Sequence, residues 1–181
     1  MAQLYKPDEL PGCAHGCEGP TRRTTGAEIY PHRADLAEKV VFVCPDCGAY
    51  VGSHEANGAA LGRPANAKLR DARQKLHGRI DPIWQQAPQT GGYAKLTPES
   101  ETRIRHAARH RVYAFLAETM GISRKRCHVA EFDIEQCRRA WSVLNRASYV
   151  EIRAWYKANR TDKAKTEARA ATAITLTRLF T

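Results

Sequence analysis

The sequence predicts an α+β protein, with a small β module in its N-terminal part followed by a small, mostly α-helical domain. Four of its six cysteines form two close pairs within the first 47 residues, with β-prone segments between them. Beyond residue 60 the apolar residues recur at the three- and four-residue spacing of amphipathic helices. We therefore expect a zinc-ribbon-like module at 10–56, a basic helical domain packed on the ribbon at 57–147, and a C-terminal helix with a flexible tail at 148–181.

Three short segments of the N-terminal module are predicted strands. Residues 28–30 and 39–43 are β-prone, and residues 49–52 can return as a third strand. Residues 19–26, GPTRRTTG, have the polar and glycine-containing composition of a turn. Two cysteine pairs joined by hairpin-like strands are typical of a zinc ribbon.

The two cysteine pairs supply the donors of a structural metal site. Three residues separate the first pair, two separate the second, and 26 residues lie between the pairs. Zinc prefers four soft ligands in a tetrahedron, and each pair supplies two of them from one turn. We therefore predict one structural Zn²⁺ ion bound by Cys13, Cys17, Cys44 and Cys47.

The sequence alone leaves other choices of zinc ligands open. His15 or His54 could replace one of the cysteines, since imidazole is also a zinc ligand. Two unrelated pairs of reduced thiols are the other interpretation. Cys137 has the helical spacing of a core residue, and we do not expect a second metal site built from Cys127 and His128.

The helical domain is predicted to begin with a basic helix over 67–77, for which Asn66 is a typical N-cap residue. Asp81 and Pro82 then have the pattern of an N-cap and the first residue of a short continuation. Residues 86–97 form a predicted loop, because glycine, proline and polar residues dominate there.

Two further helices have clear boundary signals. A long helix is predicted over 97–120, with an acidic first turn and Gly121 as its C-terminal stop. Asp133 opens a capping box that begins the next helix. Another helix is expected around 149–158, and residues 160–181 have the composition of a marginal terminal helix or a frayed tail.

The net charge of +10 is unevenly distributed. Residues 1–59 carry five Lys and Arg against eight Asp and Glu, a charge of −3, whereas residues 60–181 carry 24 against 11, a charge of +13. Such a basic field attracts polyanions and releases counterions from phosphates. The alternative is a solvated basic surface. The predicted nucleic-acid-binding residues are Lys68, Arg70, Arg73, Lys75, Arg79, Arg103, Arg105, Arg109 and Arg111.

Several classes of protein are disfavoured. No apolar run approaches the length that spans a bilayer, so no membrane partner is expected. The first twelve residues, MAQLYKPDELPG, lack the features of a secretory signal, which favours a cytoplasmic protein. In a reducing compartment, six cysteines favour metal ligands or buried thiols over disulfides. The oligomeric state is left open.

The segment CPDCGAYVGSHEANGAALG, followed by LRDARQKLHGRIDPIW, resembles the zinc-finger-containing domain of uncharacterised phage and prophage proteins. That family pairs an N-terminal cysteine knuckle with a CPxCxAYVGxH segment, a Leu-Gly turn, a basic LRxxRxxxH helix and FDPLW. Downstream elements of the family are matched at 113–122 and 128–137, so the resemblance covers roughly 10–145.

The family resemblance implies zinc binding and a phage-derived origin, and hence a bacterial host cell as the location. It implies no reaction. Ser53 stands where the family pattern has a cysteine, and Ile80 stands where it has a phenylalanine. Neither departure removes a predicted zinc ligand.

No residue is predicted to be catalytic, and His77 and Asp81 of the basic helix are the weak candidates. They are four residues apart and can share one helical face, and a nuclease needs such groups to converge on a phosphate. We prefer the structural interpretation, in which His77 packs near the ribbon and Asp81 caps a helix. The sequence contains no phosphate-cradling glycine loop.

Three functions follow from these observations. The preferred one is a non-enzymatic, phage-type zinc-binding protein that binds DNA or RNA through its basic helices. The alternative is a phage factor that binds and modulates a host protein, such as a polymerase or a nuclease. The third is a metal-dependent nuclease that uses His77 and Asp81.

Overall fold

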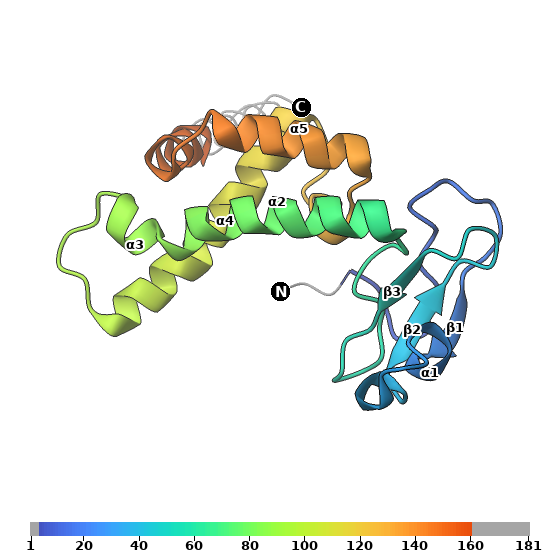
Figure 1. Cartoon of the computed structure of the whole chain (residues 1–181). Coiled ribbons are helices and arrows are strands. Elements are labelled where there is room, and N and C mark those ends of the chain that lie inside the picture. The colour runs from blue at the N-terminus through green and yellow to red at the C-terminus, as the bar shows by residue number, and fades with distance from the viewer. Residues whose placement is uncertain (1–3, 161–181) are drawn as a thin grey trace, which may run out of the picture.

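The computed structural model describes residues 4–160 and combines a small β-sheet module with a larger group of helices (Figure 1). The sheet and its loops lie at one end of the molecule, and the helices extend away from it. This arrangement confirms the predicted α+β fold class. The tail predicted at 160–181 lies, from residue 161 onward, outside the described residues.

The sheet contains three antiparallel strands in the order β1-β2-β3. They are β1 (Arg22–Thr25), β2 (Val40–Val43) and β3 (Tyr50–Gly52). The central strand β2 is the most apolar and the most buried, as expected for a strand paired on both edges. Isolated bridges from Tyr50 to Ala65 and from Ser53 to Ala60 extend this pairing. The predicted domain boundary between residues 56 and 57 therefore lies within the segment 50–65 that these bridges join.

The strands predicted at 39–43 and 49–52 are confirmed, but the first strand was misplaced. The predicted turn at 19–26 contains β1, and the predicted strand at 28–30 falls on the end of helix α1 (Gly26–Ile29) and its C-cap residue Tyr30. Strand β2 needs a partner on its second edge, and the β-prone threonines of β1 supply it.

Helix α1 begins where the chain must turn sharply. A Cβ atom at Gly26 would lie 1.8 Å from the carbonyl oxygen of Leu36, next to the short 3-10 helix η1 (Ala34–Leu36). Only glycine permits this close approach. The Glu28 carboxylate then accepts a hydrogen bond of 3.0 Å from Arg22 and one from Thr24, which ties α1 back onto β1.

Helix α2 (Ala67–Gln85) is one continuous helix. Asn66 is its N-cap, with the side-chain oxygen accepting a hydrogen bond of 2.9 Å from the Leu69 N–H, as predicted. The predicted break at Asp81 is wrong, because Pro82 lies inside the helix. Proline removes the hydrogen bond to the Gly78 carbonyl, but Gly78 is exposed and water can solvate that carbonyl. Ile80 before Pro82 is buried, and Ile83 and Trp84 after it pack against the same core, so both sides of Pro82 are held in one axis.

The remaining helices follow their predicted boundaries closely. Helix α4 (Pro98–Met120) begins with a capping box at Thr97 and ends at Gly121, whose φ of 66° is left-handed. Helix α5 (Ile134–Asn145) begins with the predicted capping box at Asp133. A 3-10 turn, η2 (Val129–Glu131), precedes α5, and residues 149–160 are helical. The predicted loop at 86–97 is partly wrong, since it contains the short helix α3 (Ala87–Thr90).

The helices share one large hydrophobic core. Helix α2 packs against both α4 and α5, and the core includes Leu76, Ile80, Leu116, Phe132 and Leu144, all fully buried. The second cluster of buried residues is much smaller and surrounds the cysteine pairs. Among residues 4–160, no helix has both the length and the apolar character that crossing a bilayer requires.

Candidate functional site

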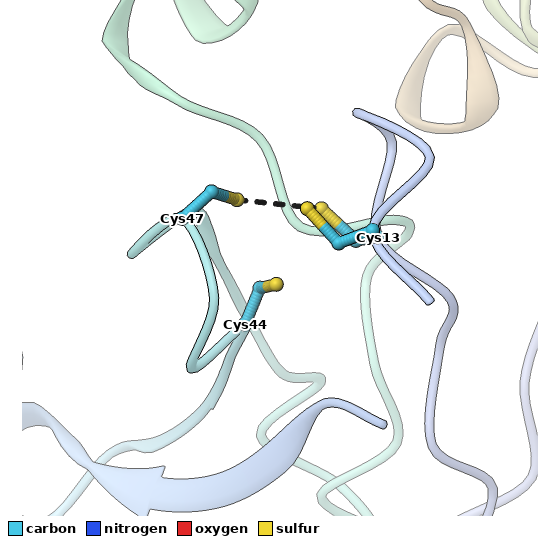
Figure 2. A group of neighbouring side chains, drawn as sticks. Cys13, Cys44 and Cys47 are labelled. Atoms are coloured by element: carbon cyan, nitrogen blue, oxygen red, sulfur yellow. Dashed lines mark hydrogen bonds between the residues drawn. The ribbon is translucent and has the colours of Figure 1, made fainter. Parts of the chain in front are cut away.

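Four cysteine side chains converge at the end of the sheet module. The sulfur atoms of Cys13, Cys17, Cys44 and Cys47 all lie within 4.8 Å of one another. Figure 2 shows the thiols of Cys13, Cys44 and Cys47 directed toward one another, with 3.6 Å between the sulfurs of Cys13 and Cys47. A tetrahedral zinc site with Zn–S bonds of about 2.3 Å has its sulfurs about 3.8 Å apart. The cluster therefore has the dimensions of one Zn(Cys)₄ site.

Each pair is held on a tight turn. In the second pair, the Gly48 N–H donates to the Cys44 carbonyl at 2.9 Å, and Gly48 has a φ of 68°. In the first pair, the Gly16 N–H lies 3.4 Å from the Cys13 carbonyl oxygen, and Gly16 has a φ of 76°. Left-handed backbone at these positions favours glycine, since a Cβ atom would be strained there. Both turns thus point two thiols of a pair in the same direction.

The thiols affect one another's ionisation. A hydrogen bond with the Cys47 thiol, followed by desolvation, raises the pKa of Cys17 to about 12. At Cys44, burial opposes ionisation, but hydrogen bonds from the backbone N–H groups of Cys47 and Asp46 outweigh it and lower the pKa. Four clustered thiols cannot all ionise without a cation between them. A bound dication removes this barrier and makes each a thiolate ligand.

Neither histidine replaces a cysteine in the ligand group. The His15 Nε2 atom accepts a hydrogen bond of 3.1 Å from the Asn66 N–H at the start of α2. His54 lies after β3, where its backbone N–H donates to the Ala59 carbonyl at 2.8 Å, and its ring is not part of the cluster. His15 therefore connects the first knuckle to the helical region.

Polar contacts around the metal centre join the two knuckles to each other and to the helices. The Gly19 N–H donates to the Asp46 carboxylate at 3.3 Å, which links the two pairs. The Arg63 guanidinium donates to the Cys13 carbonyl, and its backbone N–H donates to the Ala130 carbonyl at 3.1 Å. The metal centre is thus attached to the segment that precedes α5.

The fold and the four thiols define a zinc-binding protein with one structural ion. The model of a zinc-finger-containing domain family matches residues 11–98 of this chain. The resemblance deduced from the sequence is therefore confirmed over a segment that holds both cysteine pairs and all of α2. Its extension to residue 145 lies beyond the match, and a phage origin stays a prediction. No curated protein and no solved structure matches the chain.

The predicted nucleic-acid-binding residues differ widely in their accessibility. Arg73 is 8% exposed and donates to the carbonyls of Phe132 and Arg63, at 2.9 and 2.8 Å. Its guanidinium is therefore a structural link between α2 and the segment before α5. A phosphate cannot reach it in this arrangement, because tertiary packing has placed it on the buried side of α2.

Two other arginines of α2 also make intramolecular contacts. Arg70 lies over the Tyr50 ring, 3.9 Å from its centroid, and donates to the Ala65 carbonyl. Arg79 donates to the Leu144 carbonyl at 2.7 Å and to the Asn145 side chain at 2.9 Å, which satisfies the C-terminal end of α5. Lys68 and Lys75 remain exposed, and Lys75 pairs with Asp71 at 2.8 Å.

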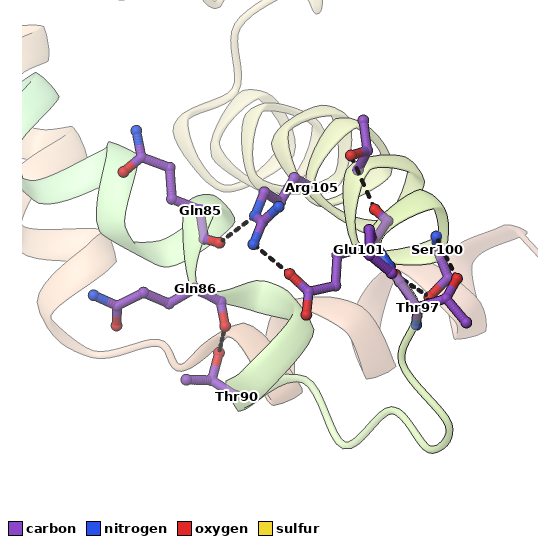
Figure 3. A network of polar contacts seen from close by, with 9 residues as sticks. Gln85, Gln86, Thr90, Thr97, Ser100, Glu101 and Arg105 are labelled. Carbon is purple, nitrogen blue, oxygen red and sulfur yellow. Dashed lines mark hydrogen bonds and ion pairs between the residues drawn. The ribbon is translucent and has the colours of Figure 1, made fainter.

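The arginines of α4 are similarly divided. Figure 3 shows Arg105 between the Glu101 carboxylate, at 2.6 Å, and the Gln85 carbonyl, at 3.1 Å. Arg111 donates to the hydroxyls of Tyr93 and Tyr149, at 2.9 and 2.8 Å. Arg109 lies over the Trp84 ring with a centroid distance of 5.4 Å. Only Arg103 among the four is fully solvent-exposed.

Other exposed cations lie outside the predicted set. The loop after α4 contains Arg124, Lys125 and Arg126, the outer face of α5 carries Arg138, and Arg146 is the C-cap residue of α5, all exposed. The basic run at 124–126 was visible in the sequence. Arg138 also had a signal in the sequence, because the helical spacing of Cys137, Ala140 and Leu144 indicates which face of α5 packs.

His77 and Asp81 do share one face of α2, with 3.8 Å between His77 Nδ1 and Asp81 Oδ1. Asp81 also accepts a hydrogen bond of 3.0 Å from the Trp84 indole. Asp81 is inside the helix, so the structural role expected for it, as a cap, is wrong. Cys127 and Cys137 are buried far from the four-thiol cluster, in the helical core.

Proposed function

We propose that this protein binds nucleic acid through exposed cations of its helical region, with the zinc centre serving as a structural element. Within the described part, residues 60–160 carry 20 Lys and Arg and nine Asp and Glu, a net charge of +11. A field of this sign and size favours a polyanionic partner. A phage-type protein in the cytoplasm of a bacterial host is part of the proposal.

The observation that carries the proposal is the contrast in how the cations are paired. In residues 1–59, three of the five Lys and Arg side chains form an ion pair with a carboxylate, namely Arg22, Arg33 and Lys39. In residues 60–160, two of the 20 form such a pair within the described structure, Lys75 and Arg105. Lys125 and Arg126, on the loop after α4, are exposed and have no carboxylate within 4 Å in the described structure. Unpaired cations are free to contact phosphates, whereas paired ones must first lose a partner.

An exposed tryptophan supports a contact with unpaired bases. Trp141 is 42% exposed on α5, and Arg138 lies one helical turn before it. Aromatic rings beside cations stack on single-stranded bases with little sequence preference, whereas a duplex keeps its bases stacked internally. The proposal therefore favours single-stranded DNA or RNA as the partner.

A matched pair of double variants tests the proposal. Lys125→Ala with Arg126→Ala removes two unpaired cations, and Arg33→Ala with Lys39→Ala removes two paired ones. Fluorescence anisotropy with a labelled oligonucleotide should show weaker binding and a salt dependence shallower by about one to two for the first variant, because up to two phosphate contacts are lost. The second variant should bind like the unmodified protein. Absence of binding at low salt, or equal losses in both variants, would refute the proposal.

The alternative is that the protein binds and modulates a host protein such as a polymerase or a nuclease. The observation in its favour is the sheet module, which has a net charge of −3 over residues 1–59 and exposes Leu10 and Leu61. Affinity capture from host lysate after nuclease treatment tests it. A stoichiometric protein partner lost on Leu61→Asp, with nucleic-acid binding absent, would favour this function. A metal-dependent nuclease stays a prediction that no observation favours, and in residues 4–160 the four cysteines form the one group of three or more close metal-ligating side chains.

A further inference from the structure

A second polar cluster lies where α2 crosses α4, away from the zinc centre. Helix α2 contributes His77 and Asp81, helix α4 contributes Tyr113, and the segment before α5 contributes His128. The rings of Tyr113 and His128 are stacked, with 5.9 Å between their centroids and 14° between their planes. These residues lie on three separate segments, so only the tertiary structure brings them together.

The Tyr113 hydroxyl is a buried group without a hydrogen-bond partner in the described structure. Tyr113 is 4% exposed, and its hydroxyl has no hydrogen-bond partner within the described residues. Burial raises the pKa of this hydroxyl to about 12, so it carries its proton near neutral pH. A buried donor without a partner costs about 1–3 kcal/mol. Such a group in a folded protein requires a ligand or a water molecule to complete it.

The acceptors in the cluster are already used. The Asp81 carboxylate accepts from the Trp84 indole at 3.0 Å and lies beside the His77 ring. The Nδ1 atom of His128 accepts a hydrogen bond of 3.4 Å from the Ala130 N–H, so the neutral ring carries its proton on Nε2. The groups around the Tyr113 hydroxyl that are still free to hydrogen-bond are therefore donors. A ligand that fits them must supply hydrogen-bond acceptors.

The charges around the cluster favour an anion. Arg109 lies over Trp84 beside the Tyr113 hydroxyl, and Arg124 lies 5.7 Å from the centroid of the Tyr113 ring. Burial first, and then the charges of His77, Arg109, Arg124 and Arg73, lower the pKa of His128 to about 4. Asp81 is the one carboxylate that acts on Tyr113, and it is paired locally. The surrounding cations thus outnumber the anion.

We propose that Tyr113, His128, His77 and Arg109 form an oxyanion site that takes a phosphate group from the backbone of bound nucleic acid. The site deepens the proposed function and rests on it for the source of the phosphate. Tyr113, the His128 Nε2–H and the Arg109 guanidinium supply donors, and Asp81 orients His77. Arginine and neutral donors together match the several acceptor oxygens of a phosphate.

Access to the site is through its partly exposed members. The side chains of His77 and Asp81 are 39% and 35% exposed, whereas the Tyr113 hydroxyl is buried. Arg109 is partly exposed as well, and it lies over the Trp84 ring and beside the Tyr113 hydroxyl. A phosphate can therefore first meet these partly exposed side chains.

Inorganic phosphate is the first probe, with the imidazole signals of the full-length zinc-loaded protein followed by NMR. Phosphate should shift the ring signals of His77 and His128 in a saturable way. Tyr113→Phe should weaken this binding about tenfold, the effect of losing one hydrogen bond to a charged group. The same variant should be at least as stable to heat as the unmodified protein, because it loses a buried donor that has no hydrogen-bond partner in the described structure. Arg33→Ala, which removes an exposed cation of the sheet module, should change neither property.

The competing explanation is a structural water on the Tyr113 hydroxyl. In that case phosphate leaves both histidine signals unmoved and Tyr113→Phe lowers the stability, and either result overturns the proposal. A short oligonucleotide should compete with inorganic phosphate for the histidine shifts. Oligonucleotide binding that leaves these signals unmoved would refute this inference alone. Phosphate binding without any oligonucleotide binding would instead refute the function on which the inference rests.

Discussion

The zinc module and the helical region are stabilised by different means. The buried residues around the four thiols are few, namely Cys13, Cys44 and Ala49, and two of these three are metal ligands. The helical core contains 19 buried residues drawn from every helix between α2 and the segment 149–160. Strand β2 also buries Val41, Phe42 and Val43, but this set is smaller than the helical core. A module with so small a core needs a metal to hold it, whereas the larger region can rely on the hydrophobic effect.

The two regions also differ in how they use charge. In the sheet module Arg22, Arg33 and Lys39 are paired with carboxylates close in sequence or across the sheet, whereas the exposed Lys6 and Arg23 form no ion pair in the described structure. In the helical region, several arginines are structural, and those on the loop after α4 have no acidic partner in the described structure. The acidic sheet module thus depends on a metal for its folding. The basic helical region is the part suited to contact a polyanion.

Removal of zinc should have the largest effect on stability, and it tests whether the two regions are stabilised independently. Cys44→Ser or a chelator should unfold the sheet module, since structural zinc contributes on the order of 10 kcal/mol to folding. The three tryptophans lie in the helical region, at positions 84, 141 and 155, so their fluorescence reports on that region selectively. NMR signals of β2 should disappear while tryptophan fluorescence and most helical circular dichroism persist.

The control for zinc removal is Cys127→Ser, which changes a buried cysteine outside the metal centre. It should retain one equivalent of zinc by metal analysis. Loss of the helical signal together with the metal would break the comparison, because it would mean that the two regions fold as one unit. The contacts of Arg63 and His15 across the junction are the physical route for such coupling.

The converse test is a cavity in the helical core. Phe132 is fully buried, and Phe132→Ala should lower the free energy of unfolding by about 3–5 kcal/mol. Denaturant unfolding followed by tryptophan fluorescence measures this change, and metal analysis should still find one zinc. Leu96→Ala is the exposed control and should change stability by less than about 0.5 kcal/mol. A Phe132→Ala protein that loses its zinc would contradict independent stabilisation of the two regions.

The smallest effect is expected from pH, through His128. Its pKa is lowered from 6.5 to about 4 in the folded state, chiefly by burial. The unfolded chain therefore binds a proton between these values and the folded one does not, so stability present above pH 6.5 is lost as the pH falls toward 4. The loss should be about 2 kcal/mol, reduced from the full shift because the ring is partly solvated.

The pH effect is isolated by comparing variants. His128→Asn should remove this part of the pH dependence in chemical denaturation experiments. His32→Gln, at an exposed position in the sheet module, should leave the dependence as it is. Parallel pH profiles for the unmodified protein and His128→Asn would show that His128 does not titrate with a lowered pKa. The effect should appear in the helical region, where His128 lies.

The sequence alone determined the features that depend on local chemistry. The spacing of the cysteines predicted the four-thiol site, because each knuckle is a single turn with a glycine at a left-handed position. Asn66, Thr97 and Asp133 marked helix starts, since a side-chain acceptor satisfies the nearby backbone N–H groups. In each case the cause lies within a few residues of the feature.

Only the tertiary structure decided the features that depend on distant partners. Strand β1 was taken for a turn because its pairing with β2 is not visible in its own residues. Pro82 stays inside α2 because packing on both sides outweighs one lost hydrogen bond. Arg73 is buried while Arg103 is exposed, although both lie in basic helices. Tyr113 and His128 meet across separate segments, so contacts between elements, which no local pattern encodes, created the second polar cluster.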